Sequence, residues 1–190
     1  MCSLPISAPG GRPGKFSLIL IIFWLVALVS ETPPAGAQTA SQVKAAFLFN
    51  FAKFVEWPPG TFANDQAALV LAFSDRDPMT EDLDALQGKM VQGRRLEVKR
   101  LRGLEDLRKC HIFFASASER AGLPQILGSL RNFPVLTVTD EVDNFAKLGG
   151  IINLIISGDK IRFEICPNNA KRSGLRISSQ LLKLAIIVED

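Results

Sequence analysis

CHIFFASASERAGLPQILGSLRNFPVLTVTD, at residues 110–140, contains two short apolar runs separated by an amphipathic segment. The runs at 111–115 and 134–138 have the length of buried strands, and the segment 123–131 between them has the pattern of a helix. Pro124 suits that helix, because proline is tolerated in the first turn. A strand, a helix and a second strand in this order predict two parallel strands of one sheet.

The alternation of strands and helices continues on both sides of this stretch. Upstream, the sequence predicts a strand at 69–73, a helix at 80–86 capped by Thr80, a half-exposed strand at 96–101 and a helical turn at 104–109. Downstream, a short helix at 144–148 precedes strands at 151–156 and 160–166, and the residues 157–159 between them indicate a hairpin. The expected fold is α/β, a three-layer sandwich with a mixed, mostly parallel sheet of about six strands, a C-terminal antiparallel hairpin and strand order 2-1-3-4-5-6.

Helices are also predicted at both ends of this domain. The first spans residues 43–57, with Ser41 as its cap and Pro58-Pro59 as its stop. Phe47, Phe51 and Phe54 recur at i, i+4 and i+7, which places them on one core-facing side. This helix is so apolar that it is buried on most sides or uses its spare surface for a partner. The last helix is predicted at 168–188, with Gly174 as a point where it can break.

The first 37 residues have the three parts of a secretory signal peptide. Arg12 and Lys15 precede a 14-residue apolar run at 16–29, and the small-residue segment Ala35-Gly36-Ala37 follows. The run is short for a membrane span, which needs about 20 residues. An uncleaved anchor is the alternative. Cleavage after Ala37 would leave one domain at 38–190, exported to the periplasm.

The charge balance argues against a nucleic-acid partner. The chain has 22 basic and 19 acidic side chains, and removal of Arg12, Lys15 and Glu31 would leave 20 and 18, a net charge of +2. A near-neutral domain lacks the basic surface that nucleic acids require. One segment, 89–109, is rich in basic residues. It is interpreted as an edge strand kept soluble by its charges, with an acidic protein or anionic lipid as the alternative partner.

The residues offer no constellation for catalysis. His111 is the only histidine, and it follows Cys110 at the start of a predicted strand. Neighbouring strand residues point to opposite faces, so a structural histidine with a local hydrogen bond is favoured over a nucleophile and base pair. One histidine and two distant cysteines do not form a metal site, and the sequence has no phosphate-binding glycine motif and no GxSxG elbow. No cofactor is expected.

Topology suggests where a small ligand would bind. In open α/β sheets, ligands lie at the carboxyl ends of the strands where the strand order reverses. Here that point falls between the strands ending at Phe73 and Ala115. A phosphate or carboxylate would suit the short polar groups and the one cation there, although a solvated loop is the simpler interpretation. The lining would be Ser74, Asp75, Arg76 and Asp77 on one side, with Ser116 and Ser118 on the other.

Two cysteines, Cys110 and Cys166, belong to the predicted domain. In the expected strand order they lie about three strands, or roughly 14 Å, apart, whereas a disulfide needs Cα atoms within about 7 Å. They are therefore expected to be unbonded unless the last strand inserts elsewhere. An unpaired thiol in the oxidising periplasm would offer an intermolecular link.

Several segments together resemble the YfiR family of periplasmic regulators. The opening and closing segments are the most specific, and order and spacing agree from about Val43 to the C-terminus. The matching segments are VKAAFLFNFAKFVEWP (43–58), SDRDP (74–78), CHIFF (110–114), PVLTVTD (134–140), FAKLGGIINLI (145–155), RFEI (162–165) and GLRISSQLLKLA (174–185).

The resemblance implies a binding protein rather than an enzyme. Such a protein inhibits a membrane diguanylate cyclase by binding its periplasmic sensor domain, which lowers cyclic di-GMP and biofilm growth. It also implies a homodimer, sequestration by an outer-membrane lipoprotein, and small nucleotides or amino acids as ligands. Some family members carry stabilising disulfides. Cys110 matches the cysteine before the histidine, but 69–73 and 145–152 lack a partner cysteine, which leaves Cys166 as the other candidate.

Residue roles follow less directly from the resemblance. The opening helix can present Phe49, Lys53 and Trp57 to a partner, and Arg172 and Arg176 can meet an anionic ligand or serve as solvated helix charges. A periplasmic ligand-binding module for a transporter or another sensor is the alternative function, and a hydrolase using His111 is a third.

Overall fold

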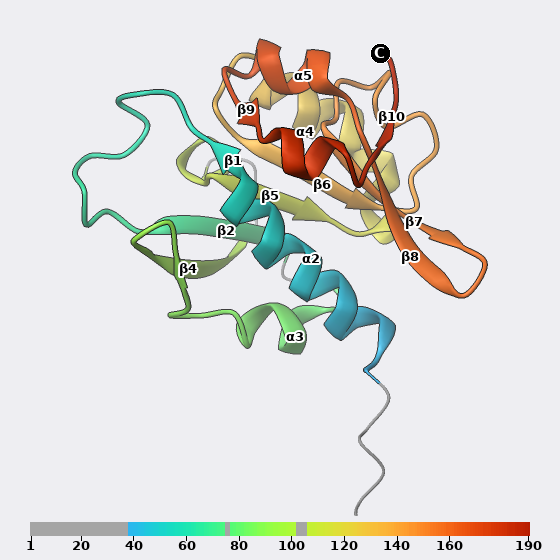
Figure 1. The fold of residues 1–190 in the computed structure, drawn as a ribbon, viewed down its shortest axis with the longest axis horizontal. Coiled ribbons are helices and arrows are strands. Elements are labelled where there is room, and N and C mark those ends of the chain that lie inside the picture. The colour runs from blue at the N-terminus through green and yellow to red at the C-terminus, as the bar shows by residue number, and fades with distance from the viewer. Residues whose placement is uncertain (1–37, 75–76, 102–105) are drawn as a thin grey trace, which may run out of the picture. The chain divides into compact units, whose positions relative to one another are not determined.

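The computed structural model describes residues 38–74, 77–101 and 106–190 (Figure 1). The predicted signal peptide therefore lies outside the described residues, as do Asp75 and Arg76. The helices are α2 (Ala40–Phe54), α3 (Thr80–Asp84), α4 (Leu123–Leu130), α5 (Pro167–Arg172) and α6 (Ser179–Leu182), with 3₁₀ turns η1 (Leu107–Lys109) and η2 (Ala117–Gly122). The strands are β1 (Val55–Glu56), β2 (Leu69–Ser74), β3 (Met90–Val91), β4 (Arg94–Leu101), β5 (Ile112–Ala115), β6 (Leu136–Asp140), β7 (Ile152–Ser157), β8 (Lys160–Ile165), β9 (Arg176–Ile177) and β10 (Ile186–Ile187).

The main sheet confirms the predicted fold class and strand order. Within the described residues its order is β10-β8-β7-β6-β5-β2-β4-β3. The six predicted strands occupy the middle of this order as 2-1-3-4-5-6, because β4 and β5 flank β2 and the later strands follow outward. The strands from β4 to β7 pair in parallel, and β7 and β8 form the antiparallel hairpin. The two short strands β3 and β10 extend the sheet at its edges.

Helices cover both faces of the sheet, which makes three layers (Figure 1). Alternate residues of one strand show this directly: Leu71 and Phe73 of β2 join the core under α2, whereas Val70 and Ala72 join the core under α4. Side chains alternate along a strand, so a strand buried on both faces reads as a continuous apolar run. This is why β2, β5 and β6 were recognisable in the sequence.

The opening helix differs from its prediction at both ends. Thr39, not Ser41, is the cap, and it forms a capping box with Gln42. The helix ends at Phe54, three residues before Trp57, because Val55 is extended and pairs with Ile177. Its buried stripe is also shifted. Phe51 is fully buried, but Phe47 and Phe54 pack only partly against the core, and the remaining buried positions are Lys44, Ala45, Leu48 and Ala52.

The helix predicted at 168–188 is confirmed only in part: it breaks at Gly174, as the sequence allowed, but the piece beyond the break is mostly not helical. The segment forms α5, β9, α6 and β10 instead. Gly174 has φ +74, a left-handed conformation that ends α5. Beyond it, β9 pairs with β1 and β10 pairs with β8, so partners distant in sequence outweigh the local helical pattern.

Three smaller predictions also need correction. Residues 144–148 form turns rather than a helix, and Asn144 has φ 54. The cap of α3 is Met79, whereas the Thr80 hydroxyl donates to the Asp77 carbonyl oxygen. The helical turn predicted at 104–109 is confirmed only at η1, because 102–105 lie outside the described residues.

Candidate functional site

The predicted ligand site lies where β2, β5 and β6 end, at the point where the strand order reverses. The structure brings Asp77 and Ser116 together, since the backbone and the side chain of Ser116 both donate hydrogen bonds that lower the pKa of the Asp77 carboxyl group. The hydroxyls of Ser116 and Ser118 lie 2.7 Å apart, and the Asp77 amide donates to the Ser74 carbonyl oxygen. Four of the six predicted residues therefore form one polar cluster, and the other two, Asp75 and Arg76, lie outside the described residues.

Asp77 is the most unusual member of this cluster. Its residue is 4% exposed, and its Oδ1 accepts a hydrogen bond from the Met79 amide at 2.8 Å. Its Oδ2 is buried and has no hydrogen-bond partner among the described residues. Burial raises the pKa of Asp77 above its usual 3.8, and Asp140 adds to the rise, whereas the bonds from Met79 and Ser116 lower it in part.

Two residues that the sequence analysis missed complete the cluster. Lys44 of α2 donates to Asp140 Oδ2 of β6 at 2.7 Å, and their side chains are only 10% and 13% exposed. Asp140 Oδ1, like Asp77 Oδ2, is buried, and neither oxygen accepts a hydrogen bond within the part of the chain that the structure describes. One signal could have revealed the pair: Lys44 lies one helical turn before Leu48 on the buried stripe, where a charge needs a partner.

This buried carboxylate cluster, defined as Lys44, Asp77, Ser116 and Asp140, supports binding more readily than catalysis. The Ser116 and Ser118 hydroxyls interact with each other, and no hydrogen bond among the described residues joins either of them to a histidine or a thiol. Within the described ranges, no three His, Cys, Asp or Glu side chains gather in a way that could hold a metal ion. Carboxylate oxygens without partners would accept hydrogen bonds from a donor.

A pH titration of stability tests the state of Asp77. A folded pKa above the unfolded one means that Asp77 contributes most stability below pH 3.8 and progressively less as pH rises through the folded pKa. Asp77→Asn keeps the acceptor for Met79 and removes the buried charge. We therefore expect its Tm to exceed that of wild type at pH 7, with the difference shrinking towards pH 3.8. Thermal unfolding at several pH values measures this, and a difference independent of pH would contradict it.

The Cys110-His111 pair has the local structural role that the sequence favoured. The His111 Nδ1 accepts a hydrogen bond from the Val70 amide at 3.0 Å, and its ring stacks on Phe62 at 4.4 Å. Burial, together with the charge of Arg94, lowers the pKa of His111 to about 4. The Cys110 thiol points elsewhere and donates to the Leu107 carbonyl oxygen.

Both cysteines are free and buried in this structure, as the strand order predicted. Burial raises the pKa of the Cys110 thiol to about 12, so it stays protonated. Cys166 is fully buried. Neither thiol lies at the surface of the folded protein, where an intermolecular disulfide would form.

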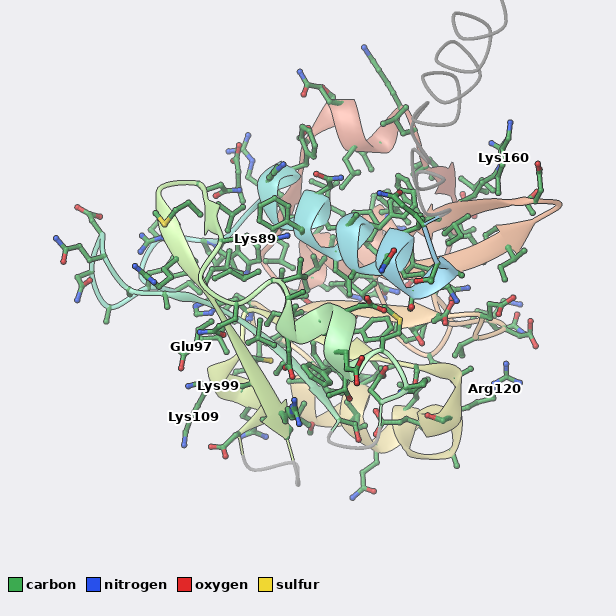
Figure 2. All side chains as sticks on the ribbon, turned by 90° about the horizontal axis from the view of Figure 1, so that it is seen from below. Lys89, Glu97, Lys99, Lys109, Arg120 and Lys160 are labelled. Atoms are coloured by element: carbon green, nitrogen blue, oxygen red, sulfur yellow. The ribbon has the colours of Figure 1, made fainter. Side chains whose placement is uncertain are left out.

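Of the three residues predicted to meet a partner, Phe49 and Lys53 lie together on α2, whereas Trp57 lies beyond the end of the helix. Phe49 is half-buried, and the ammonium groups of Lys53 and Lys89 lie 4.4 and 5.6 Å from its ring centroid. We call these three residues the Phe49 surface (Lys89 is labelled in Figure 2). Trp57 lies beyond the helix, and its Nε1 donates to the His111 carbonyl oxygen at 3.3 Å.

The basic segment 89–109 mostly uses its charges within the molecule. Arg100 pairs with Asp84, Lys99 with Glu97 and Lys109 with Asp106, and the Arg108 guanidinium covers the Phe133 ring. Lys99 and Lys109 project from the β4 side of the molecule, away from Lys160 (Figure 2). Within the described residues, β3 pairs with β4 only at Arg94 and Arg95. The rest of β4 therefore forms an edge of the sheet, and its charged side chains suit such an edge because they oppose pairing with another chain.

Arg172 and Arg176, the two arginines predicted to meet an anionic ligand, lie in different environments. Arg172 donates to Asp190 and to Asn169 at the end of α5. Arg176 has an 85% exposed side chain and lies 3.7 Å from Glu56 across the β1–β9 pair. The structure brings neither of them to the buried carboxylate cluster through any hydrogen bond or ion pair among the described residues.

Two solved structures resemble the described part of the chain. No helix among the described residues has the length and hydropathy needed to cross a membrane. A conserved domain protein from Vibrio cholerae shares the fold with a TM-score of 0.51 and 9% identity over 78% of this chain. An ABC domain in complex with L-Trp from Streptococcus pneumonia has a TM-score of 0.46 and 14% identity over 64% of this chain. The chain spans 60% and 55% of those two structures.

The family match covers most of the chain. Residues 41–186 match the YfiR/HmsC-like family, a range that runs from the start of α2 to the start of β10. It includes the opening helix, the buried carboxylate cluster and the C-terminal elements. The chain therefore belongs to the YfiR/HmsC-like family of periplasmic regulators.

Proposed function

We propose that this protein binds the periplasmic sensor domain of a membrane diguanylate cyclase and holds the enzyme inactive, which lowers cyclic di-GMP. The family match over residues 41–186 carries this proposal. A homodimer, and sequestration by an outer-membrane lipoprotein that relieves inhibition, complete it. In this scheme the protein acts by binding and performs no reaction of its own.

The Phe49 surface supports α2 as the contact with the cyclase. An aromatic ring flanked by two cations offers an apolar centre with a charged rim, which is the usual composition of a binding surface. Lys53 is exposed, and its ammonium donates a hydrogen bond to Asn50, one turn earlier on the same helix. An acidic patch around an apolar pocket is the matching surface on the partner.

Deletion and complementation in the native host test the proposal. We expect cyclic di-GMP to rise when the gene is deleted and to return when the wild-type protein is exported. The double variant Phe49→Ala/Lys53→Glu should fail to restore the low level, whereas Lys160→Glu, at the exposed start of β8, should restore it. Periplasmic amounts of each variant are compared by immunoblot. An unchanged cyclic di-GMP level on deletion, with the cyclase expressed, would contradict the proposal.

A periplasmic ligand-binding module is the second candidate function. The observation that favours it is a pair of buried oxygens, Asp77 Oδ2 and Asp140 Oδ1, which have no partner in 38–74, 77–101 or 106–190. They lie at the strand ends where ligands of α/β sheets bind. Deletion of the gene would then leave cyclic di-GMP unchanged, and neighbouring genes for a transporter would support this alternative.

A further inference from the structure

A cleft of about 340 Å³ opens at the other end of the strands from the buried carboxylate cluster. It lies between the end of α4, the turn at 147–149 and α5, beside the residues that lead into β6. Its size is at the lower end of the range that takes small molecules, about 300–1,000 Å³. Its apolar lining includes Leu130 and Val135, which are nearly fully buried.

Three cations from three different segments line this cleft. Arg131 follows α4, Lys147 lies in the turn, and Arg172 ends α5. The only acidic side chain in the lining is Asp190. Within the described ranges, neither Arg131 nor Lys147 forms an ion pair, so the cleft carries an excess of positive charge. Such an excess attracts anions.

A buried side chain, Asn169, holds the guanidinium of Arg172 in place. It donates to Oδ1 of Asn169, a residue that is only 2% exposed. The Asn169 amide nitrogen donates in turn to the carbonyl oxygens of Ala146 and Gly150, at 2.8 and 2.6 Å. The buried amide is therefore fixed by two backbone groups and orients the arginine towards the cleft. A preoriented guanidinium loses little entropy when it binds a carboxylate.

Arg172 already holds a carboxylate. Its second donor meets Asp190 Oδ2, and this bond lowers the pKa of Asp190. Asp190 also accepts from the Asn168 side chain. A carboxylate therefore fits the position beside the Arg172 guanidinium. In this structure the carboxylate is that of Asp190, which lies after β10 and outside the sheet.

We propose that this cleft binds a small polycarboxylate, one carboxylate of which takes the place of Asp190 on Arg172. The other carboxylates lie near Arg131 and Lys147, and the carbon skeleton rests on the apolar floor. Asp190 is then an internal competitor that keeps the cleft closed to weak ligands. This site is separate from the Phe49 surface, and its test does not depend on the proposed inhibition of a cyclase.

Isothermal titration calorimetry of the exported, full-length mature protein with citrate tests the proposal at low ionic strength. We expect saturable binding with one site per chain. Lys147→Gln and Arg172→Gln should each weaken binding about tenfold, the loss expected for one charge-assisted contact. Asp190→Asn, which keeps the bond to Asn168 but removes the competing charge, should strengthen it severalfold. Lys160→Gln removes an equal charge outside the cleft and should leave binding unchanged.

Each contrary outcome has a clear meaning. Absence of saturable citrate binding in both the wild type and Asp190→Asn would overturn the proposal. Equal weakening by Lys160→Gln would show that the attraction comes from net charge and not from the cleft. Competition by inorganic phosphate as effective as citrate would overturn the carboxylate assignment. Arg172→Gln can disturb Asn169. If the arginine variant unfolds, Lys147→Gln decides the result, because Lys147 forms no ion pair with the described residues.

Discussion

Lys44→Ala should lower the free energy of unfolding by about 3–5 kcal/mol, the cost typical of breaking a buried ion pair from one side. The variant leaves the Asp140 carboxylate buried, with one oxygen that already lacks a partner and a second that loses its donor. It also places a carboxylate without a counter-charge near Asp77. Urea unfolding at pH 7, followed by circular dichroism, measures the change.

A double variant separates the charge from the packing. In Lys44→Met/Asp140→Asn both charges are absent and the long side chain still fills its place on α2. We expect this protein to recover most of the lost stability, because replacing both partners of a buried pair is often neutral. If Lys44→Ala costs less than about 1 kcal/mol, the value of a solvent-exposed pair, the buried pair does not stabilise the fold in the way described here.

Phe51→Ala should have an effect of similar size, about 3–5 kcal/mol, for a different reason. The Phe51 ring is completely buried and contacts the rings of Phe47 and Phe163, with centroids 5.9 and 5.1 Å away. Truncation removes these contacts and leaves a cavity between α2 and the β8 strand. Urea unfolding again measures the loss.

Phe49→Ala is the matched control on the same helix. It removes the same side chain from a half-buried position, where the ring packs only partly against the core and lies beside two lysines, so we expect a loss well below that of Phe51→Ala. Equal losses for the two variants would contradict the assigned burial of α2. The same unfolding measurement tests whether the Phe49 variant is folded, which the complementation experiment requires.

These predictions separate stability from binding along one helix. Lys44 and Phe51 face the sheet and fix α2 against β6 and β8, whereas Phe49 is only half-buried and Lys53 is exposed. A rigid helix lets the Phe49 surface bind a partner with little loss of conformational entropy. Loss of inhibition in a Lys44 variant would therefore reflect unfolding, whereas loss in a Phe49 variant would reflect binding.

The candidate site was predictable only in part. Ser74, Asp77, Ser116 and Ser118 were found because parallel strands end at the same edge of a sheet, and the topology rule names the pair of strands. Lys44 and Asp140 were missed because their pairing joins residues 96 positions apart. Arg172 was named from the sequence as a residue that can meet an anionic ligand, but the cleft was missed. Its three cations come from the end of α4, a turn and α5, and no local pattern connects them.

The sequence by itself determined the six central strands, their order and the hairpin, since each buried strand is a local apolar run and right-handed connections leave few arrangements. It also carried the family resemblance over most of the chain. The tertiary structure decided how the C-terminal segment folds and which charges are buried. Val55 pairs with Ile177 and Ile187 with Ile165, so backbone partners far away in the chain replace the helix that the local pattern of residues 168–188 favours. Backbone groups that find such partners are satisfied without a helix, and this physical reason cannot be read from neighbouring residues alone.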